Sequence, residues 1–423
     1  MKQTPLYDLH LRQGAYMAEF GSYEMPLWYP TGAKAEHLAV ITSAGLFDTS
    51  HMSVLTLRGH DSRRLLQRCL SKDLDACIGP RKTEMVNGRC VYGVLLNHQA
   101  HVLDDAILYQ CSTDQFMLVV NAAMGQPIAE HLHRERTESE EVTITDCTDQ
   151  VGKVDLQGPA AARILARILE NPEDVFTRMV YFSFKGTFRP GILAGEDIRL
   201  KDGTPLMVSR TGYTGEFGFE LFVSPEHTLP LWEQLLAAGE RDGLIACGLA
   251  ARDSLRAGAV LPLSHQDIGP WPFMHTPWNF TLPLREDGTM GKQFIGASAL
   301  ADPKGEMWTL PFAGFDPRKI PVSQKNFVMD GQGNKIGTIL TCATDMAIDR
   351  IDGVIVSLAS PAAQGRPKAF NPRGLCCGFI RVTHNLAPGT LVTLTDGKRN
   401  IPVEIRTDVR PDRTARKPMA SML

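Results

Sequence analysis

The sequence has no long hydrophobic run, no excess of positive charge and no paired-cysteine motif. No apolar stretch in its 423 residues approaches the roughly 20 residues that a membrane-spanning helix needs, so no membrane role is predicted. The first residues, Met1-Lys2-Gln3-Thr4-Pro5, lack the apolar core of a signal peptide. With a formal net charge of −3, the chain lacks the excess of basic residues that non-specific nucleic-acid binding needs. These absences favour a globular protein that binds neither membranes nor nucleic acid.

The nine cysteines show no spacing typical of a disulfide framework or of a metal site. Cys376 and Cys377 are adjacent, the others are scattered, and no Cys-x-x-Cys occurs. An odd number fits reduced thiols, so we expect a cytoplasmic protein in which buried cysteines behave as small hydrophobes. His51 and His265 lack metal-ligand partners at the usual spacings, and we therefore predict no metal site.

Length and composition are those of a globular chain with more than one domain. Hydrophobic residues make up 43% and charged residues 22%, and 423 residues predict two or three domains. Apolar periodicity predicts a helix over residues 7–20, whereas residues 53–145 read mostly as strands, with helices near 61–70 and 124–135. Prolines and tryptophans crowd residues 262–290, which predicts an extended crossing segment. Short strands parted by Gly and Asp-Gly turns after residue 305 predict a β-barrel or sandwich, and the last dozen residues predict a basic tail.

An acidic pair, Asp104-Asp105, interrupts an otherwise apolar strand predicted over residues 102–109. A second apolar strand and a turn precede it, which predicts a hairpin. Because neighbouring side chains of a strand point to opposite faces, at least one carboxylate is expected in an apolar setting, where desolvation raises its pKa. Such a carboxylate suits proton transfer or the holding of an amine. An edge-strand Asp that caps a turn or pairs with an arginine is the structural alternative, and this segment alone leaves both open.

Two further segments carry candidate ligand-binding groups. Residues 210–220 hold glycines at every third position, without the spacing of a dinucleotide site or a P-loop. Tyr213 and Glu220 in this stretch could stack on a heterocycle and accept hydrogen bonds from its amino groups, and a plain glycine-rich hairpin is the alternative. Arg252 and Arg256 lie four residues apart on one face of a predicted helix. They could bind a carboxylate ligand or take part in a surface ion-pair network.

Together with other segments in the same order, these stretches resemble the aminomethyltransferase, or T-protein, family of the glycine-cleavage system. Each match is weak alone, but all of them in order identify the chain as a member of this family. The matching segments are Thr4-Pro5-Leu6, residues 21–29, Gly45-Leu46-Phe47-Asp48-Thr49-Ser50-His51-Met52, Leu103-Asp104-Asp105, Val119-Val120-Asn121-Ala122, Leu156-Gln157-Gly158-Pro159, residues 210–220 and residues 248–256.

The resemblance implies an α+β fold, a three-domain cloverleaf around a central folate site. Two interleaved α+β folate-binding domains would come from residues 1–300, one from about 1–52 with 145–255 and the other from about 53–144. A C-terminal β-barrel would come from residues 305–423. The implied cofactor is tetrahydrofolate, and the implied partner is a lipoyl carrier protein.

By the same resemblance, Asp105 is the catalytic carboxylate, and Asp104 is its structural neighbour, held by backbone or by an arginine. Asp105 would position and activate the N5 amine of the pterin, which attacks an aminomethyl group on the lipoyl arm so that ammonia leaves. Glu220 would hydrogen-bond the pterin's amino edge. The other implied folate-binding residues are Met52, Tyr92, Asn121, Tyr213, Arg252 and, for the glutamate tail of the folate, Arg410.

The sequence departs from the family pattern after Arg256. Residues 261–275 replace an acidic stretch and a Pro-x-Glu-like turn with aromatic and histidine content, and residues 359–373 have no family counterpart. These changes fall where the one-carbon donor is expected to approach, so two alternatives stay open. One is a tetrahydrofolate-dependent demethylase or methyltransferase that acts on a free small-molecule methyl donor. The other is a non-catalytic folate-binding protein, against which the intact Leu-Asp-Asp motif argues.

Overall fold

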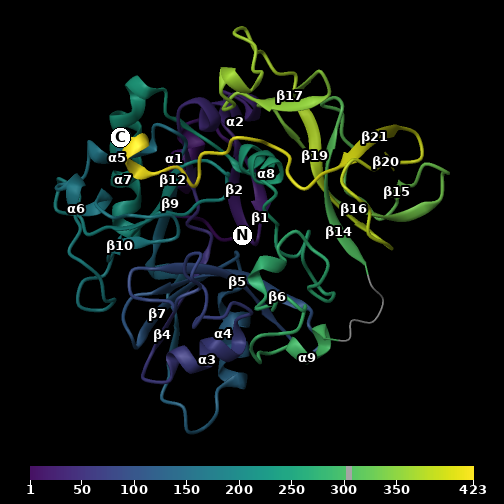
Figure 1. Ribbon diagram of the computed structural model, residues 1–423. Coiled ribbons are helices and arrows are strands. Elements are labelled where there is room, and N and C mark those ends of the chain that lie inside the picture. The colour runs from purple at the N-terminus through teal and green to yellow at the C-terminus, as the bar shows by residue number, and fades with distance from the viewer. Residues whose placement is uncertain (302–306) are drawn as a thin grey trace.

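The computed structural model describes residues 1–301 and 307–423 and shows a mixed α+β protein with three lobes around a common centre (Figure 1). Two open sheets with their helices form two lobes, and a closed barrel forms the third. The predicted α+β fold class is confirmed, and so is the barrel expected after residue 305. Residue 305 itself lies outside the described residues, and the division of residues 1–300 into two domains stays a prediction.

The first sheet is six-stranded and draws its strands from distant parts of the chain. A large apolar core that includes Leu156, Phe219 and Trp232 lies between this sheet and its helices. Its strands, in spatial order, are β10 (Phe184–Gly186), β11 (Met207–Ser209), β12 (Gly218–Val223), β9 (Gly152–Gln157), β3 (Gly45–Asp48) and β13 (Ile245–Ala246). The associated helices are α1 (Tyr7–Arg12), α2 (Ala33–Thr42), α5 (Ala161–Ala166), α6 (Pro172–Phe176), α7 (Thr228–Gly239) and α8 (Leu249–Gly258).

The second sheet is five-stranded and contains the predicted hairpin with the acidic pair. Strands 90–96 and 102–109 of the prediction are confirmed, and so are the helices near 61–70 and 124–135. The strand order is β5 (Cys90–Leu96), β6 (Val102–Gln110), β7 (Gln115–Val120), β4 (Ser53–Arg58) and β8 (Thr143–Asp146). The helices α3 (Ser62–Cys69) and α4 (Gly125–Glu135) cover one side and share an apolar core with it.

The barrel closes through six strands around its own core, which includes Val328, Ile380 and Val403. The strand order is β14 (Trp308–Gly314), β19 (Leu375–Val382), β16 (Lys335–Asp345), β15 (Phe327–Met329), β20 (Leu391–Thr395) and β21 (Asn400–Ile405). A separate hairpin of β17 (Ile348–Ile351) and β18 (Val354–Ser357) extends from the barrel (Figure 1).

Residues 262–290, predicted as an extended crossing segment, lie against the second sheet and the barrel and contain little regular structure. Trp278 and Phe273 are buried in an apolar cluster with Val94 of β5 and Phe379 of β19. After this segment, the short helix α9 (Ala297–Leu300) packs into the same cluster. The segment therefore forms part of the wall between two lobes.

Two predictions near the chain ends are wrong. Only residues Tyr7–Arg12 of the predicted 7–20 helix are helical, because β1 (Tyr16–Phe20) pairs with β2 (Tyr23–Trp28) in a hairpin. Pairing with a neighbouring strand overrides helical periodicity at this point. The expected basic tail is also an ordered part of the structure: Met422 joins the core of the first lobe, and Thr414 accepts a backbone hydrogen bond from Phe217.

A buried ion pair between α8 and the 262–290 segment is hydrogen-bonded to the barrel. Arg256 of α8 is fully buried and donates to Asp267, and also to Thr341 Oγ1 of β16 at 3.0 Å. Asp267, also fully buried, accepts a second hydrogen bond from Thr341 at 2.7 Å. Buried charges are tolerated only when they are paired in this way, so this contact fixes where the barrel sits.

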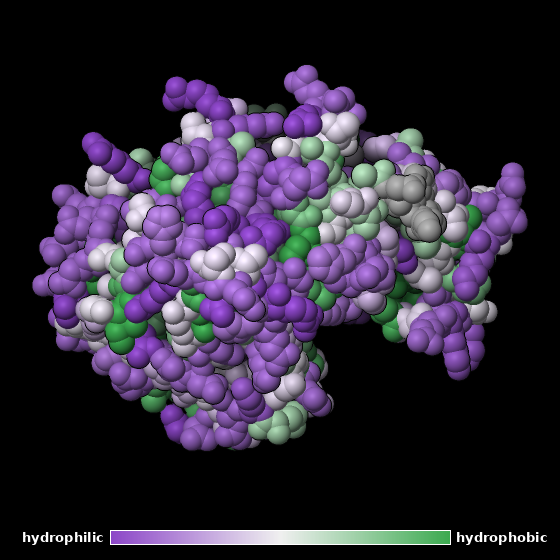
Figure 2. Space-filling model, turned by 90° about the horizontal axis from the view of Figure 1, so that it is seen from below, coloured by the Kyte–Doolittle hydropathy of each residue, from purple (hydrophilic) through white to green (hydrophobic). Residues whose placement is uncertain are grey.

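Figure 2 shows the face seen from below as mainly hydrophilic, with hydrophobic side chains in small separate groups. The larger apolar side chains are instead gathered in the cores of the three lobes. Among the described residues, no helix is both long and apolar enough to span a membrane.

Replacing Arg256 by Met should strongly destabilise the protein, because it leaves the buried Asp267 without its cation. We expect a loss of about 3–5 kcal/mol of stability, measured as a lower temperature of unfolding. Asp253→Asn is the matched control, because it removes the half-exposed partner of the same arginine and should cost less than about 1 kcal/mol. Equal effects of the two substitutions would contradict the importance of the buried pair.

Candidate functional site

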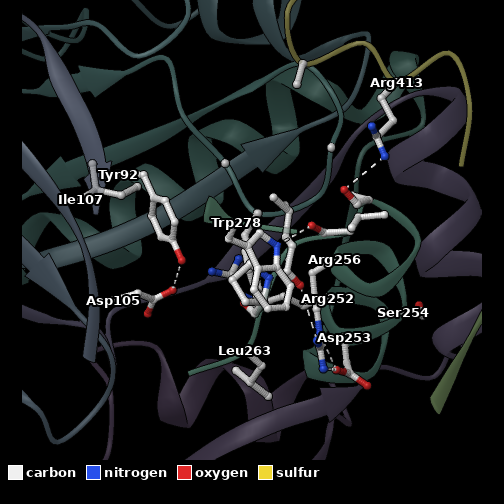
Figure 3. Close-up of a pocket in the computed structure, with 18 of the residues that line it drawn as sticks. Tyr92, Asp105, Ile107, Arg252, Asp253, Ser254, Arg256, Leu263, Trp278 and Arg413 are labelled. Carbon is white, nitrogen blue, oxygen red and sulfur yellow. Dashed lines mark hydrogen bonds and ion pairs between the residues drawn. The ribbon is translucent and has the colours of Figure 1, made fainter. Parts of the chain in front are cut away.

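A cavity of about 1410 Å³ lies at the centre, where the two sheets, α8, the 262–290 segment and the barrel meet. Apolar groups such as Ile107, Val119 and Trp278 line much of its wall, and the acidic pair reaches it through Asp105. Figure 3 shows Asp105 and Tyr92 pointing toward one another on one side, with the α8 arginines on the other. The sequence-predicted residues that line this cavity are Met52, Tyr92, Asp105, Asn121, Tyr213, Glu220 and Arg252.

Strand β6 presents the two carboxylates to different surroundings, as strand geometry requires. Asp104 is fully buried, with its neighbours Val102 and Ala106 also buried, whereas Asp105 faces the cavity. Pairing of β6 with β7 brings Asn121, the residue after β7, beside them. The predicted alternation of the two faces is therefore confirmed.

The amide of Asn121 bridges the two carboxylates. Its Nδ2 group donates to Oδ1 of Asp104 at 2.7 Å and to Oδ1 of Asp105 at 2.6 Å. The backbone N–H of Asn121 adds a third hydrogen bond, to Oδ2 of Asp104 at 2.9 Å. The carboxylates are thus held next to each other although they leave the strand on opposite sides.

Asp105 has the properties of a base that works near neutral pH. Its Oδ2 accepts a hydrogen bond of 2.8 Å from the hydroxyl of Tyr92, on the paired strand β5. Burial, and then the negative charge of Asp104, raise the pKa of Asp105 to about 7, although the Tyr92 and Asn121 hydrogen bonds oppose the rise. A carboxylate of this pKa can take up a proton at physiological pH.

Asp104 is the more enclosed member of the pair. Burial raises its pKa to about 6, against the effect of hydrogen bonds from Ser264 and Asn121. The Ser264 hydroxyl lies 2.7 Å from Oδ1 of Asp104. The sequence predicts that backbone or an arginine holds Asp104. The backbone N–H of Asn121 does so, and the Ser264 hydroxyl stands where an arginine was expected.

A ladder of alternating charges runs along the opposite wall from Arg252 to Glu220. Arg252 Nη1 lies 2.8 Å from Asp155, and the other oxygen of Asp155 lies 2.6 Å from Lys153 Nζ. Lys153 also pairs with Glu220 at 2.9 Å. Two cations and two anions balance, which allows all four to lie at a largely buried position.

Glu220 and Tyr213 are held firmly before any ligand arrives. Glu220 accepts hydrogen bonds from Thr211 at 2.5 Å and Tyr109 at 3.2 Å, in addition to its ion pair with Lys153. The Tyr213 hydroxyl donates to the carbonyl of Pro262, and burial raises the pKa of this phenol. The Arg252 guanidinium lies 4.9 Å from the centre of the Tyr213 ring, a cation–π contact.

Arg410 does not lie with the other predicted residues, and this part of the site prediction is corrected. Its side chain is fully buried and is not part of the cavity wall. It pairs with Asp345 at 2.6 Å and with Glu216 at 3.2 Å. Asp345 also accepts from His37 of α2 at 3.0 Å, so Arg410 serves to join the barrel to the rest of the chain.

Several residues that line the cavity were not predicted as site residues, although one of them, His51, lies inside a matching segment. His51 lines the cavity, its Nδ1 atom has no hydrogen-bond partner, and burial lowers its pKa to about 4, so the ring is neutral. Phe280 lines the cavity with 62% of its surface exposed. In the part of the chain that the structure describes, no group of His, Cys, Asp and Glu is arranged to hold a metal ion.

The chain is similar in sequence to known proteins over most of its length. The family model of the GCVT N-terminal domain matches residues 6–282. The Aminomethyltransferase of Geobacillus kaustophilus (strain HTA426) is 32% identical over 378 residues, which cover 88% of this chain and 95% of that protein. The Aminomethyltransferase of Symbiobacterium thermophilum is 34% identical over 343 residues, covering 81% of this chain and 85% of that protein.

The likeness extends to the three-dimensional structure. The crystal structure of glycine cleavage system aminomethyltransferase T from Bartonella henselae superposes with a TM-score of 0.75 and 26% identity, covering 99% of each chain. The chain has three lobes around a cavity that holds an acidic pair, and its relatives are named Aminomethyltransferase. It is therefore an enzyme of the transferase class. The chain belongs to the T-protein, or aminomethyltransferase, family, and the resemblance drawn from its motifs is confirmed.

Asp105→Asn should stabilise the protein at alkaline pH. Because the pKa of Asp105 is raised on folding, its contribution to stability is complete below the ordinary pKa of Asp and is lost as pH rises toward about 7. Asn resembles the protonated acid and avoids this loss. The unfolding temperature of Asp105→Asn relative to the unmodified protein should therefore increase from pH 4 to 7 and level off above. Asp149→Asn, at an exposed carboxylate, is the control. A flat difference for Asp105→Asn would contradict the raised pKa.

Proposed function

We propose that this enzyme transfers a one-carbon unit to tetrahydrofolate and that Asp105 activates the accepting amine. The observation that carries the proposal is a carboxylate at the cavity wall whose pKa is raised to about 7, in a chain similar to proteins named Aminomethyltransferase. The preferred donor is the aminomethyl-lipoyl group of a carrier protein, which agrees with the glycine cleavage relative.

The cavity has the size and lining that two reactants require. Pockets for one drug-sized molecule have volumes of about 300–1,000 Å³, so about 1410 Å³ leaves room for a folate and the reacting end of a donor together. Apolar side chains such as Val119 and Trp278 offer contact to flat rings. Polar groups of the wall, among them Asp105, Asn121 and Glu220, can fix the orientation of a heterocycle.

Tetrahydrofolate, when bound, supplies the amine that accepts the one-carbon unit. Asp105 accepts a hydrogen bond from the N–H of this amine. It takes up the proton as the amine attacks, so that no positive charge builds up on the nitrogen. Tyr92 and Asn121 hold the carboxylate in place, and the negative charge of Asp104 makes it a stronger base. Glu220, already oriented by Thr211 and Lys153, accepts hydrogen bonds from the amino edge of the ring.

A second donor class is favoured by the 262–290 segment. Pro277, Trp278 and Phe280 of this segment line the cavity, and the Phe280 ring lies 6.3 Å from the ring of Tyr92, next to Asp105. An aromatic wall so near the reacting carboxylate can enclose a small molecule with a methyl group. The alternative function is therefore transfer from a free small-molecule methyl donor to tetrahydrofolate.

Asp105→Asn should reduce turnover by about 10²–10⁴-fold, because the amide cannot take up the proton. Tetrahydrofolate affinity should change little, since the amide preserves the size of the side chain and can still hydrogen-bond. Binding is measured by calorimetry and turnover by the rate of folate product formation. Asp149→Asn, an exposed carboxylate far from the acidic pair in the sequence, is the control. Unchanged turnover in Asp105→Asn would remove this residue from the mechanism.

The donor is identified by offering the enzyme and tetrahydrofolate each class of donor separately. Aminomethyl-lipoyl carrier protein should yield methylenetetrahydrofolate and ammonia, both measurable in the same sample. Methyltetrahydrofolate from a free methyl donor, with no reaction of the carrier protein, would reject the preferred donor. If tetrahydrofolate binds but no donor reacts, the chain is a folate-binding protein without turnover.

A further inference from the structure

His265 is the basic side chain closest to the acidic pair. Its Nε2 atom lies 3.7 Å from Oδ1 of Asp104, and half of its side chain is exposed. Among the described residues, no other Lys, Arg or His lies within ion-pair distance of Asp104 or Asp105. In the part of the chain that the structure describes, the carboxylates therefore have a single basic neighbour at ion-pair distance, and this neighbour touches solvent.

The backbone of His265 adopts a conformation that side chains other than glycine rarely occupy. Its φ angle is 63°, in the left-handed region. Histidine is tolerated there at a cost, and such residues persist where the surrounding structure imposes the conformation. A strained residue beside a catalytic carboxylate is a reason to test it for function.

The loop around His265 is anchored on both sides. On one side, the Ser264 hydroxyl donates to Asp104. On the other side, the buried Asp267 accepts from Arg256, from Thr341 and from the backbone N–H of Leu263. These contacts hold the imidazole near Asp104, so its position follows from the fold.

Several charged and titratable groups near the acidic pair have partners of their own. Tyr92 of β5 donates to Asp105, and Tyr213 donates to a backbone carbonyl. Arg256 is paired with Asp267, and Arg252 of the same helix with Asp155. Strand β7 contributes the neutral Asn121. Among the described residues, His265 is thus the basic side chain at ion-pair distance from the pair, and it adds a positive charge there when it is protonated.

We propose that His265 is a positioning residue that sets the charge of the acidic pair, acting on Asp105 through Asp104 and the amide of Asn121. The inference rests on the proposed function for its catalytic meaning. A positive imidazolium 3.7 Å from Asp104 favours ionised carboxylates, so it lowers the pH at which the pair loses its protons. The enzyme thereby retains an ionised pair at lower pH than burial alone would permit.

The test compares His265→Gly, His265→Gln and His265→Lys. Glycine removes the charge and accepts the left-handed conformation, glutamine removes the charge but retains a side chain, and lysine restores a permanent charge. Loss of the charge should move the acid limb of kcat/KM for tetrahydrofolate to higher pH by about 0.5–1 unit. His265→Lys should return the limb to the original pH or below it. His98→Gln, an exposed histidine near the same hairpin, should leave the limb in place.

A second measurement does not require turnover. Infrared difference spectra against Asp105→Asn and Asp104→Asn follow the protonation of the pair directly, and they should show the same upward shift in His265→Gly and His265→Gln. An unchanged carboxyl titration in both variants would overturn the proposal, whatever the transfer activity. If the titration shifts but no donor reacts, the electrostatic role of His265 stands and the proposed function fails.

Discussion

The hydrogen bonds from one amide, that of Asn121, are the interaction on which the site depends. Adjacent residues of a strand point to opposite faces, so Asp104 and Asp105 would ordinarily have separate surroundings. Strand pairing places Asn121 where its two N–H groups reach both carboxylates. The pair is therefore close enough for the charge of one to raise the pKa of the other, yet its oxygens are not left without donors. Burial provides the larger effect on the pKa, and the neighbouring charge adds to it.

Other buried charges around the cavity are also compensated by neighbouring groups. Charges taken out of water are stable only when opposite charges and hydrogen bonds replace the solvent. The ladder from Arg252 to Glu220 meets this condition on one wall, and Arg256 with Asp267 meets it between α8 and the 262–290 segment. Arg410 with Asp345 meets it at a third place. Paired charges thus line the cavity and help to join the barrel to the rest of the chain, together with the apolar cluster around Trp278.

Sequence reasoning succeeded where a local pattern determines the outcome. The apolar run around Asp104-Asp105 and the turn before it were enough to predict the hairpin and the two faces, and family motifs located the residues that line the cavity. It failed where a partner outside the segment decides. The helical periodicity of residues 16–20 gives way to a strand because β2, which follows after a two-residue turn, pairs with it. Arg410 turns away from the cavity because Asp345 and Glu216 lie within reach, and both are far from it in the sequence, as Ser264 is from Asp104.

The segment after Arg256, where the sequence departs from its family, contacts both the proposed donor region of the cavity and the acidic pair. Trp278 and Phe280 form cavity wall on the side where a donor would be enclosed, whereas Ser264 and His265 approach Asp104 from behind the accepting site. The carbonyl of Pro262 holds the Tyr213 hydroxyl. Because one continuous segment makes all these contacts, a change that reshapes the donor wall also shifts groups that set the charge of the acidic pair. Under the proposed function, donor choice and the basicity of Asp105 are therefore physically linked, and a divergent segment here is expected to alter both together.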